Sequence, residues 1–253
     1  MKYYPKTYVA FLDILGFKDL VNNNTHDQLT SIYFNLANAV TEIVSTIIKK
    51  TSPHTMKKIV SKNESNINSI IISDSILFWA NGSSNRDFFN ILIVVSKLLT
   101  KSIFLGLPMR GAITLGPLTT IKLNLQKNFD NSISTFIGKS ISKSFELEKK
   151  QQWHGCVVDE ECINHFQSQL NDTDRSSKSL KDFIMGIMMN YNVPMKVKSE
   201  NMHAVKWGEK RKGIDMPVEM IEFAFMANQK KSDDNSVKEK IKNTVEYFNS
   251  LNI

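Results

Sequence analysis

The stretch from Tyr8 to Leu20, YVAFLDILGFKDL, decides the fold. Its first part is an almost unbroken run of apolar, β-forming residues that ends at Gly16, which predicts a fully buried β-strand. Asp13 stands near the end of that strand. A carboxylate that leaves water without a partner destabilises a fold by several kcal/mol, so its presence predicts a cation, a hydrogen-bond network or a functional site.

The composition is that of a globular protein. The chain has 253 residues, of which 42% are hydrophobic and 23% charged, enough for one large domain or one domain with an appendage. No apolar run reaches the roughly 18 residues that a membrane-spanning helix needs, and the opening MKYYPKTY lacks the apolar core of a signal peptide. We therefore expect a cytoplasmic protein with no membrane partner.

The net charge of +7 suits an anionic ligand, a nucleic acid or an acidic membrane surface. The lysines are dispersed rather than gathered in one block with aromatic residues, which favours a solvated surface, and no nucleic-acid partner is expected. Cys156 and Cys162 lack the CxxC spacing of a zinc site, so we expect two buried free thiols.

The periodicity of apolar residues predicts the main elements. Helical spacing indicates a long amphipathic helix over residues 26–50 and a buried helix over residues 86–104. Two short apolar runs joined by Ser-Asp-Ser at residues 73–75 predict a β-hairpin with Asp74 at its tip.

The rest of the chain alternates strands, helices and loops, without an internal repeat or a domain linker. The expected segments are a weak strand at 56–60, strands on both sides of a Gly116-Pro117 turn between 108 and 122, a helix after Gly138, a strand after Gly155, a loop at 168–179, a hairpin within 191–208 and a closing helix at 238–251. This order predicts an α+β fold, with a mixed, mostly antiparallel sheet and helices packed on one face.

Asp13 and Asp74 are the two informative carboxylates, because each is flanked by strongly β-forming residues. If their strands are neighbours, both carboxylates project from one edge of the sheet, and their repulsion calls for a divalent cation. Oxygen ligands of this kind suit magnesium or manganese, and a pair of such ions can activate a hydroxyl and neutralise a leaving pyrophosphate. The alternative is structural, with one Asp capping a helix and the other in an ordinary tight turn.

Four stretches in order resemble the motifs of class III nucleotidyl cyclases: FLDILGF at 11–17, SDS at 73–75, LPMRGAITLGPL at 107–118 and FIGKSISKSFELEKKQQWHGCVVDEE at 136–161. The resemblance covers residues 8–161, with a weaker echo to Trp207, and implies a ferredoxin-like βαββαβ core. On this basis we expect residues 1–165 to form the catalytic core and residues 166–253 to form the C-terminal part of the same domain.

Within that family the sequence is most similar to the pyrimidine cyclases of the bacterial Pycsar antiphage system. The shared features are the FLDILGFK opening, the RGA strand, the ELE helix followed by Trp-x-Gly, and a VPxK segment leading to a terminal Trp. The resemblance implies a homodimer that converts CTP or UTP to a 3',5'-cyclic nucleotide and pyrophosphate during phage infection. The product would act on a separate cyclic-nucleotide-sensing effector.

The resemblance also implies roles for residues of the opening stretch. Asp13 and Asp74 match the two aspartates that bind a pair of Mn²⁺ or Mg²⁺ ions, and the carbonyl of Ile14 matches the group that completes one metal shell. Backbone N–H groups of Gly16 and Phe17 match the turn that cradles the triphosphate, an arrangement that suits anions.

The sequence departs from the purine cyclases at two catalytic positions. Ser142 stands in place of the Asn that orients the ribose, and Glu146 in place of the Arg that stabilises the transition state. A carboxylate cannot stabilise developing phosphate charge, so either the protein is inactive or another cation replaces the Arg. Arg110 is the candidate, because a guanidinium among aliphatic strand residues needs an anion. A salt bridge to a surface carboxylate is the alternative for Arg110.

Four further positions bear on the substrate. Lys196 corresponds to the late-strand Lys that holds phosphate in the family, with Lys198 as its competitor and a solvent-facing role as the alternative for both. The two residues that read adenine in adenylate cyclases, a Lys and an Asp, fall at Ile70 and Thr135. Their loss argues against ATP and leaves CTP and UTP open.

Two other functions remain open. A catalytically silent cyclase-like module that binds a nucleotide is suggested by the lost Asn and Arg, and a basic nucleic-acid-binding protein is suggested by the charge of +7.

Overall fold

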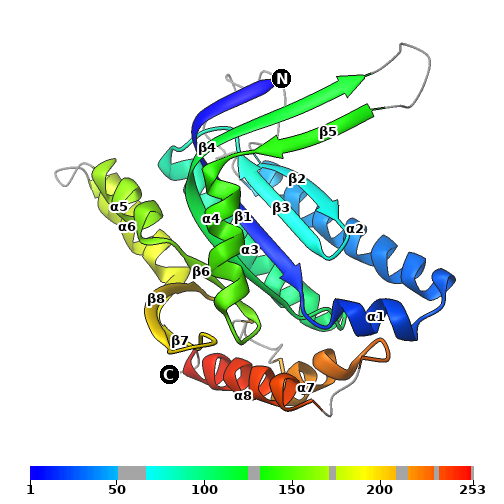
Figure 1. Ribbon diagram of the computed structural model, residues 1–253. Coiled ribbons are helices and arrows are strands. Elements are labelled where there is room, and N and C mark those ends of the chain that lie inside the picture. Colours follow the sequence, from blue (N-terminus) through cyan, green and yellow to red (C-terminus); the bar gives the residue numbers. More distant parts are fainter. Residues whose placement is uncertain (51–66, 125–131, 171–174, 209–215, 231–233, 252–253) are drawn as a thin grey trace.

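The computed structural model describes residues 1–50, 67–124, 132–170, 175–208, 216–230 and 234–251. One eight-stranded sheet forms its centre, with the strand order β2-β3-β1-β4-β6-β8-β7 and with β5 paired to β4 beyond that path (Figure 1). The strands are β1 (Lys2–Ile14), β2 (Ile67–Ile72), β3 (Ser75–Ala80), β4 (Met109–Asn124), β5 (Ser132–Ile137), β6 (Gly155–Val158), β7 (Met188–Val193) and β8 (Glu200–Val205).

Among the described strands only β4 and β6 run parallel, and the other pairings are antiparallel. The helices are α1 (Phe17–Asn23), α2 (His26–Lys50), α3 (Asn85–Phe104), α4 (Lys139–Lys150), α5 (Glu160–Ser168), α6 (Arg175–Gly186), α7 (Val218–Met226) and α8 (Asn235–Ser250). The expected α+β class with a mixed, mostly antiparallel sheet is therefore confirmed.

The two faces of β1 bury different layers. From Tyr8 onward the even-numbered residues of β1, Tyr8, Ala10, Leu12 and Ile14, belong to the main core, which also contains much of α3. Val9 belongs to a smaller cluster on the other face. Helix α4 packs on that second face, where the ring of Phe145 lies edge-on to Phe11 at 5.6 Å. Helices thus cover both faces rather than one. Because side chains alternate along a strand, Asp13 points to the α4 face.

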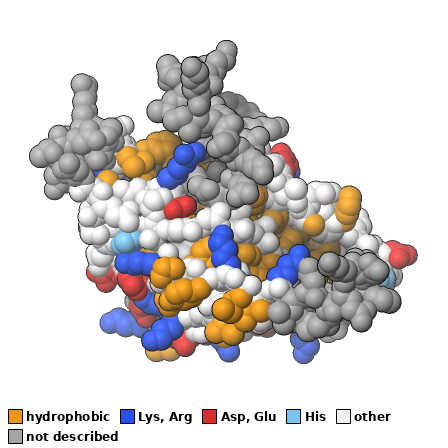
Figure 2. Space-filling model, turned by 90° about the horizontal axis from the view of Figure 1, so that it is seen from above, with side chains coloured by type: hydrophobic (Ala, Val, Ile, Leu, Met, Phe, Trp, Pro, Cys, Tyr) orange, Lys and Arg blue, Asp and Glu red, His pale blue; other side chains and the backbone are white. Residues whose placement is uncertain are grey.

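The main core contains residues from both the first and the last parts of the chain, since Tyr8 and Phe248 belong to the same cluster of buried residues. The division at residue 165 stays a prediction. Within the described residues, no helix combines the length and the apolar character that a bilayer crossing requires. On the face shown in Figure 2, basic side chains are dispersed among acidic and uncharged ones, as the sequence indicates.

Two further sequence-based predictions are wrong, besides the expectation that helices pack on one face. Gly116 and Pro117 do not form a turn, because β4 runs continuously from Met109 to Asn124. The pairing of β1 with β4 shifts register between Tyr4 and Thr7, and this irregularity accommodates a proline that cannot donate to the ladder. The expected loop at 168–179 is helical at both ends, where α5 finishes and α6 begins.

The other predicted elements are found. The hairpin with Asp74 at its tip is formed by β2 and β3, and the late hairpin by β7 and β8. Both cysteines are buried and free. The weak strand expected at 56–60 lies outside the described residues.

Gly111 shows how tightly β1 and β4 pack next to Asp13. A Cβ atom at this position would lie 2.6 Å from the carbonyl oxygen of Phe11 and 2.8 Å from Cγ of Leu12, closer than any real contact. We expect Gly111→Ala to lower the free energy of unfolding by about 2–4 kcal/mol, because backbone atoms cannot move aside. Gly186→Ala is the matched control, since no atom beyond its chain neighbours and its own helix backbone lies within 4 Å of its added methyl group. Equal urea midpoints for the two variants would contradict this packing.

Candidate active site

The two carboxylates predicted from the sequence meet at one edge of the sheet. Strands β1 and β3 are neighbours, with Asp13 directly opposite Ser75, and Asp74 precedes Ser75 at the hairpin tip. The N–H of Ile14 donates to the carbonyl of Asp74 at 2.9 Å, which ties the tip to the end of β1. The tip is also held by Tyr33 of α2, whose hydroxyl donates to the carbonyl of Ser73 at 2.9 Å.

Asp13 lies in a site with an excess of negative charge. Its pKa is raised to about 7, first by burial and then by the nearby carboxylates of Glu148 and Asp74, while Arg110 and Ser75 act in the opposite direction. The charge of Asp74 also contributes to raising the pKa of Tyr33 to about 12, although burial is the larger cause. Arg110 therefore pairs with the carboxylates of Asp13 and Glu148, and Asp74 adds a third carboxylate close to Asp13.

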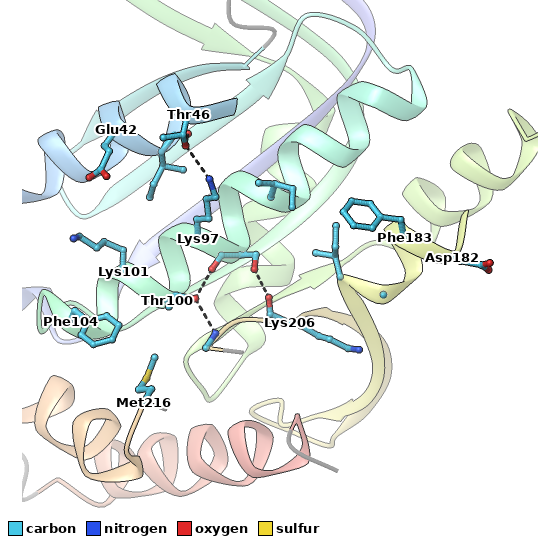
Figure 3. Close-up of a pocket in the computed structure, with 16 residues that line it drawn as sticks. Glu42, Thr46, Lys97, Thr100, Lys101, Phe104, Asp182, Phe183, Lys206 and Met216 are labelled. Carbon is cyan, nitrogen blue, oxygen red and sulfur yellow. Dashed lines mark hydrogen bonds between the residues drawn. The ribbon is translucent and has the colours of Figure 1, made fainter. Parts of the chain in front are cut away.

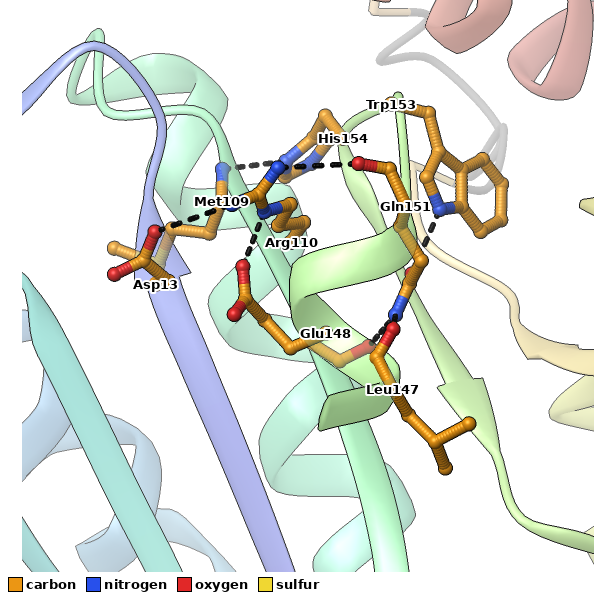
Figure 4. A network of polar contacts seen from close by, with 9 residues as sticks. Asp13, Met109, Arg110, Leu147, Glu148, Gln151, Trp153 and His154 are labelled. Carbon is orange, nitrogen blue, oxygen red and sulfur yellow. Dashed lines mark hydrogen bonds and ion pairs between the residues drawn. The ribbon is translucent and has the colours of Figure 1, made fainter. Parts of the chain in front are cut away.

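Arg110 lies opposite Asp13 on the neighbouring strand β4 (Figure 4). Its Nη2 atom lies 3.9 Å from Oδ2 of Asp13, its Nε donates to Oε1 of Glu148, and its Nη1 donates to the carbonyl of Gln151 at 3.1 Å. The side chain of Glu148 is 2% exposed. The salt-bridge alternative for Arg110 is thus realised, but with a buried carboxylate rather than a surface one.

Glu148 and Gln151 are site residues that sequence reasoning missed. Gln151 donates to the carbonyl of Gly111 at 2.8 Å and accepts from Nε1 of Trp153 at 2.8 Å, so it fixes the backbone on which Arg110 rests. The available signal was the spacing of Ser140, Ser144 and Glu148, three buried polar residues four positions apart on α4. Glu146 and Ser142, which stand at the positions of the missing Arg and Asn, are both exposed.

The turn after β1 follows Asp13 directly. Gly16 has a φ of 77° and precedes the first residue of α1, Phe17. The N–H of Leu15 donates to the carbonyl of Pro108 at 2.8 Å, which joins this turn to the start of β4. A left-handed backbone of this kind explains the glycine.

Lys196 lies on the Glu148 side of the site. The residue is exposed, its N–H donates to the carbonyl of Lys150 at 2.8 Å, and its charge acts to lower the pKa of Glu148, against the larger effect of burial. Lys240 of α8 is a further cation here that the sequence did not reveal. Burial lowers its pKa, and the charges of Arg110 and Lys196 add to this effect. Lys198 is exposed.

Thr135 is remote from Asp13 within the chain. It pairs with Ile121 on β4, eleven positions beyond Arg110, which corresponds to about 35 Å along the strand. Ile70 lies on β2 and packs against the smaller cluster that contains Leu77 and Trp79. Thr135 can therefore contribute to a site at Asp13 only from a second copy of the chain.

A cavity of about 880 Å³ lies elsewhere, between α2, α3 and α6 (Figure 3). It is lined by apolar side chains such as Phe104 and Phe183 and by Lys97, Lys101 and Lys206. None of the residues expected in the active site lines it.

The donor chemistry at Asp13 and Asp74 fits a divalent cation. Hard carboxylate oxygens at the edge of a sheet suit Mg²⁺ or Mn²⁺, and burial together with the neighbouring carboxylates of Glu148 and Asp74 raises the pKa of Asp13. Among the described residues, no group of three or more His, Cys, Asp or Glu side chains is arranged to hold a metal. Asp13 and Asp74 would therefore need backbone or substrate oxygens to complete a coordination shell.

The arrangement of the sheet and helices is similar to that of known enzymes. The guanylate cyclase domain of RhGC from Catenaria anguillulae, solved in complex with GTP, matches with a TM-score of 0.53 and 10% identity, over 82% of this chain and 99% of that domain. The fold is that of a nucleotidyl cyclase domain. The catalytic core of a rhodopsin-guanylyl cyclase with converted specificity, in complex with ATPalphaS, matches with a TM-score of 0.52 and 11% identity, over 81% and 97% of the two chains.

The guanylyl cyclase Cya2 has the same cyclase fold, with a TM-score of 0.50, 9% identity and coverage of 85% of this chain and 97% of that one. Comparison of the sequence with models of protein families and with curated proteins finds no match. At these identities the similarity establishes the fold, and the chemistry has to be argued from the residues.

Proposed function

We propose that the protein is a nucleotide cyclase that converts CTP or UTP to the 3',5'-cyclic nucleotide and pyrophosphate. The observation that carries the proposal is the meeting of Asp13 and Asp74 at one edge of a cyclase-type sheet, beside the turn at Gly16. Asp13 and Asp74, with the carbonyl of Ile14, would hold two Mn²⁺ or Mg²⁺ ions. These ions would lower the pKa of the ribose 3'-hydroxyl and neutralise the pyrophosphate.

The chain's own residues have to align two groups of the same nucleotide. The ribose 3'-oxygen attacks the α-phosphorus of the same nucleotide, so correct positioning of the two groups removes most of the entropic cost. Gly16 and Phe17 would bind the triphosphate through backbone N–H groups. Arg110 and Lys196 would supply the positive charge that the exposed Glu146 cannot supply.

The preference for a pyrimidine rests on the sequence resemblance. Ile70 and Thr135 replace the Lys and Asp that read adenine, and neither can form the same pair of polar contacts. Because Thr135 is remote from Asp13 in one subunit, a base site that includes it requires a homodimer. In bacterial antiphage defence the cyclic product would act on a separate effector.

The test is to incubate the purified protein with Mn²⁺ and each of the four nucleoside triphosphates, and to identify products by mass spectrometry. We expect a cyclic pyrimidine nucleotide and an equal amount of pyrophosphate. Absence of a cyclic product from all four would refute the proposal. Nucleotide-dependent thermal stabilisation without turnover would instead support the silent-module alternative.

A further inference from the structure

Lys230 is a buried lysine outside the site described above. Its residue is 7% exposed, and its ammonium donates to the carbonyls of Gly106 at 2.7 Å and Ala224 at 2.8 Å. No ion pair within the described parts of the chain includes it. Burial lowers the pKa of Lys230 to about 7. Burying an ammonium group that is bound only by carbonyl groups lowers the stability of the fold, which points to a functional reason for the burial of Lys230.

The segment that carries Lys230 connects α1 with the link between α3 and β4. Asn24, just after α1, donates to the carbonyl of Asn228 at 2.7 Å. The side-chain amide of Asn228 donates in turn to the carbonyls of Leu105 and Gly106, each at 3.2 Å. Asn228 and Gln229 both have a φ of 59°, a left-handed conformation that non-glycine residues adopt at a cost.

Lys230 also touches the turn proposed to bind phosphate. A Cβ atom built on Gly16 would lie 3.0 Å from Cδ of Lys230, so the lysine stem packs directly against Gly16. The ammonium is two bonds beyond that Cδ. The ammonium of Lys230 therefore lies close to the turn at Gly16, while it donates to the carbonyls of Gly106 and Ala224.

We propose that Lys230 positions the turn at Gly16 and Phe17 and gives it positive potential, so that it binds the triphosphate of the substrate. The inference rests on the proposed function for the identity of the anion. Lys230 is a positioning residue that reaches the substrate through Gly16. A charge in a poorly solvated place acts on a nearby anion more strongly than one at the surface, which explains the burial.

The test compares Lys230→Met with Lys238→Met, the same change at an exposed lysine of α8. We expect Lys230→Met to raise KM for the nucleotide about tenfold with kcat within about twofold, because binding is lost while the reacting groups are unchanged. A simple folding defect would lower the active fraction, and so kcat, without moving KM. Lys238→Met should match the unmodified protein in both constants.

Two further readouts do not need turnover. Calorimetry with inorganic pyrophosphate and Mn²⁺ should show about tenfold weaker binding for Lys230→Met. Amide hydrogen exchange over residues 15–18 should be faster in Lys230→Met and in Asn24→Ala, which loosens the segment but keeps the charge. If Lys230→Met does not fold, the same exchange and KM measurements on Asn24→Ala decide whether this segment positions the turn at Gly16.

The outcomes separate the two proposals. If the unmodified protein makes no cyclic nucleotide, the proposed function fails, and pyrophosphate binding and amide exchange still decide the role of Lys230. If the unmodified protein is active and Lys230→Met keeps its KM, pyrophosphate affinity and exchange rates, this inference alone is overturned.

Discussion

Asp13→Asn is expected to remove cyclic-nucleotide formation while leaving the fold intact. Asn lacks the negative charge that a divalent cation requires, so we expect kcat to fall by at least about a thousandfold. The shape of the side chain is preserved between β1 and β4. The measurement is product formation by mass spectrometry in Mn²⁺, with Asp27→Asn, an exposed aspartate at the start of α2, as the control. Full activity of Asp13→Asn would contradict the metal assignment.

The stability of Asp13→Asn is also expected to depend on pH differently from that of the unmodified protein. The pKa of Asp13 is about 7 in the folded protein and has an ordinary value of 3.8, so the folded state holds a proton that the unfolded state releases. The stabilisation from this proton is fully present below pH 3.8 and is lost as the pH rises through 7. Asn has no such proton to lose.

In chelator-treated samples, the Tm of the unmodified protein should therefore fall relative to that of Asp13→Asn between pH 5 and pH 8. Adding Mn²⁺ at pH 8 should raise the Tm of the unmodified protein and leave that of Asp13→Asn unchanged, because binding to the folded state alone stabilises it. A Tm difference that does not change with pH would show that Asp13 is ionised in the fold without a metal.

Glu148→Ala is expected to have the largest effect on stability. Removing this carboxylate leaves the guanidinium of Arg110, whose side chain is 14% exposed, without its closest partner. Breaking a buried pair from one side lowers the free energy of unfolding by about 3–5 kcal/mol. Urea denaturation measures the effect, and Glu146→Ala, an exposed carboxylate on the same helix, should cost less than about 0.5 kcal/mol. Equal losses from the two changes would contradict the buried pair.

The double variant Arg110→Met with Glu148→Met separates stability from catalysis. Replacing both partners with apolar side chains should restore the free energy of unfolding to within about 1–2 kcal/mol of the original value. If Arg110 supplies positive charge to the reaction, the restored fold should still show kcat lowered about a hundredfold or more. A stable double variant with full activity would reduce Arg110 to a structural role.

Much of the fold could be predicted because it depends on local patterns. The apolar run around Asp13 predicts β1, the Ser-Asp-Ser tip predicts the β2–β3 hairpin, and helical periodicity predicts α2 and α3. These patterns fail where tertiary pairing overrides them. Pro117 is tolerated in β4 because β1 changes register opposite it, and that register is a property of two strands rather than of one.

The sequence by itself determined that Asp13 stands near the end of a strand and Asp74 at the tip of a hairpin, because apolar alternation and turn residues both lie within short segments. That these strands are neighbours was decided by the tertiary structure. Only the tertiary structure decided that Glu148 pairs with Arg110 and that Lys230 packs beneath Gly16. Those contacts join residues far apart in the chain. The four-residue spacing of Ser140, Ser144 and Glu148 marks one face of α4, but no pattern within one segment identifies the partner of Glu148 or of Lys230. The effects of these contacts on stability and on local charge arise from burial. Burial exists only after the sheet, α4 and the C-terminal segment have packed together.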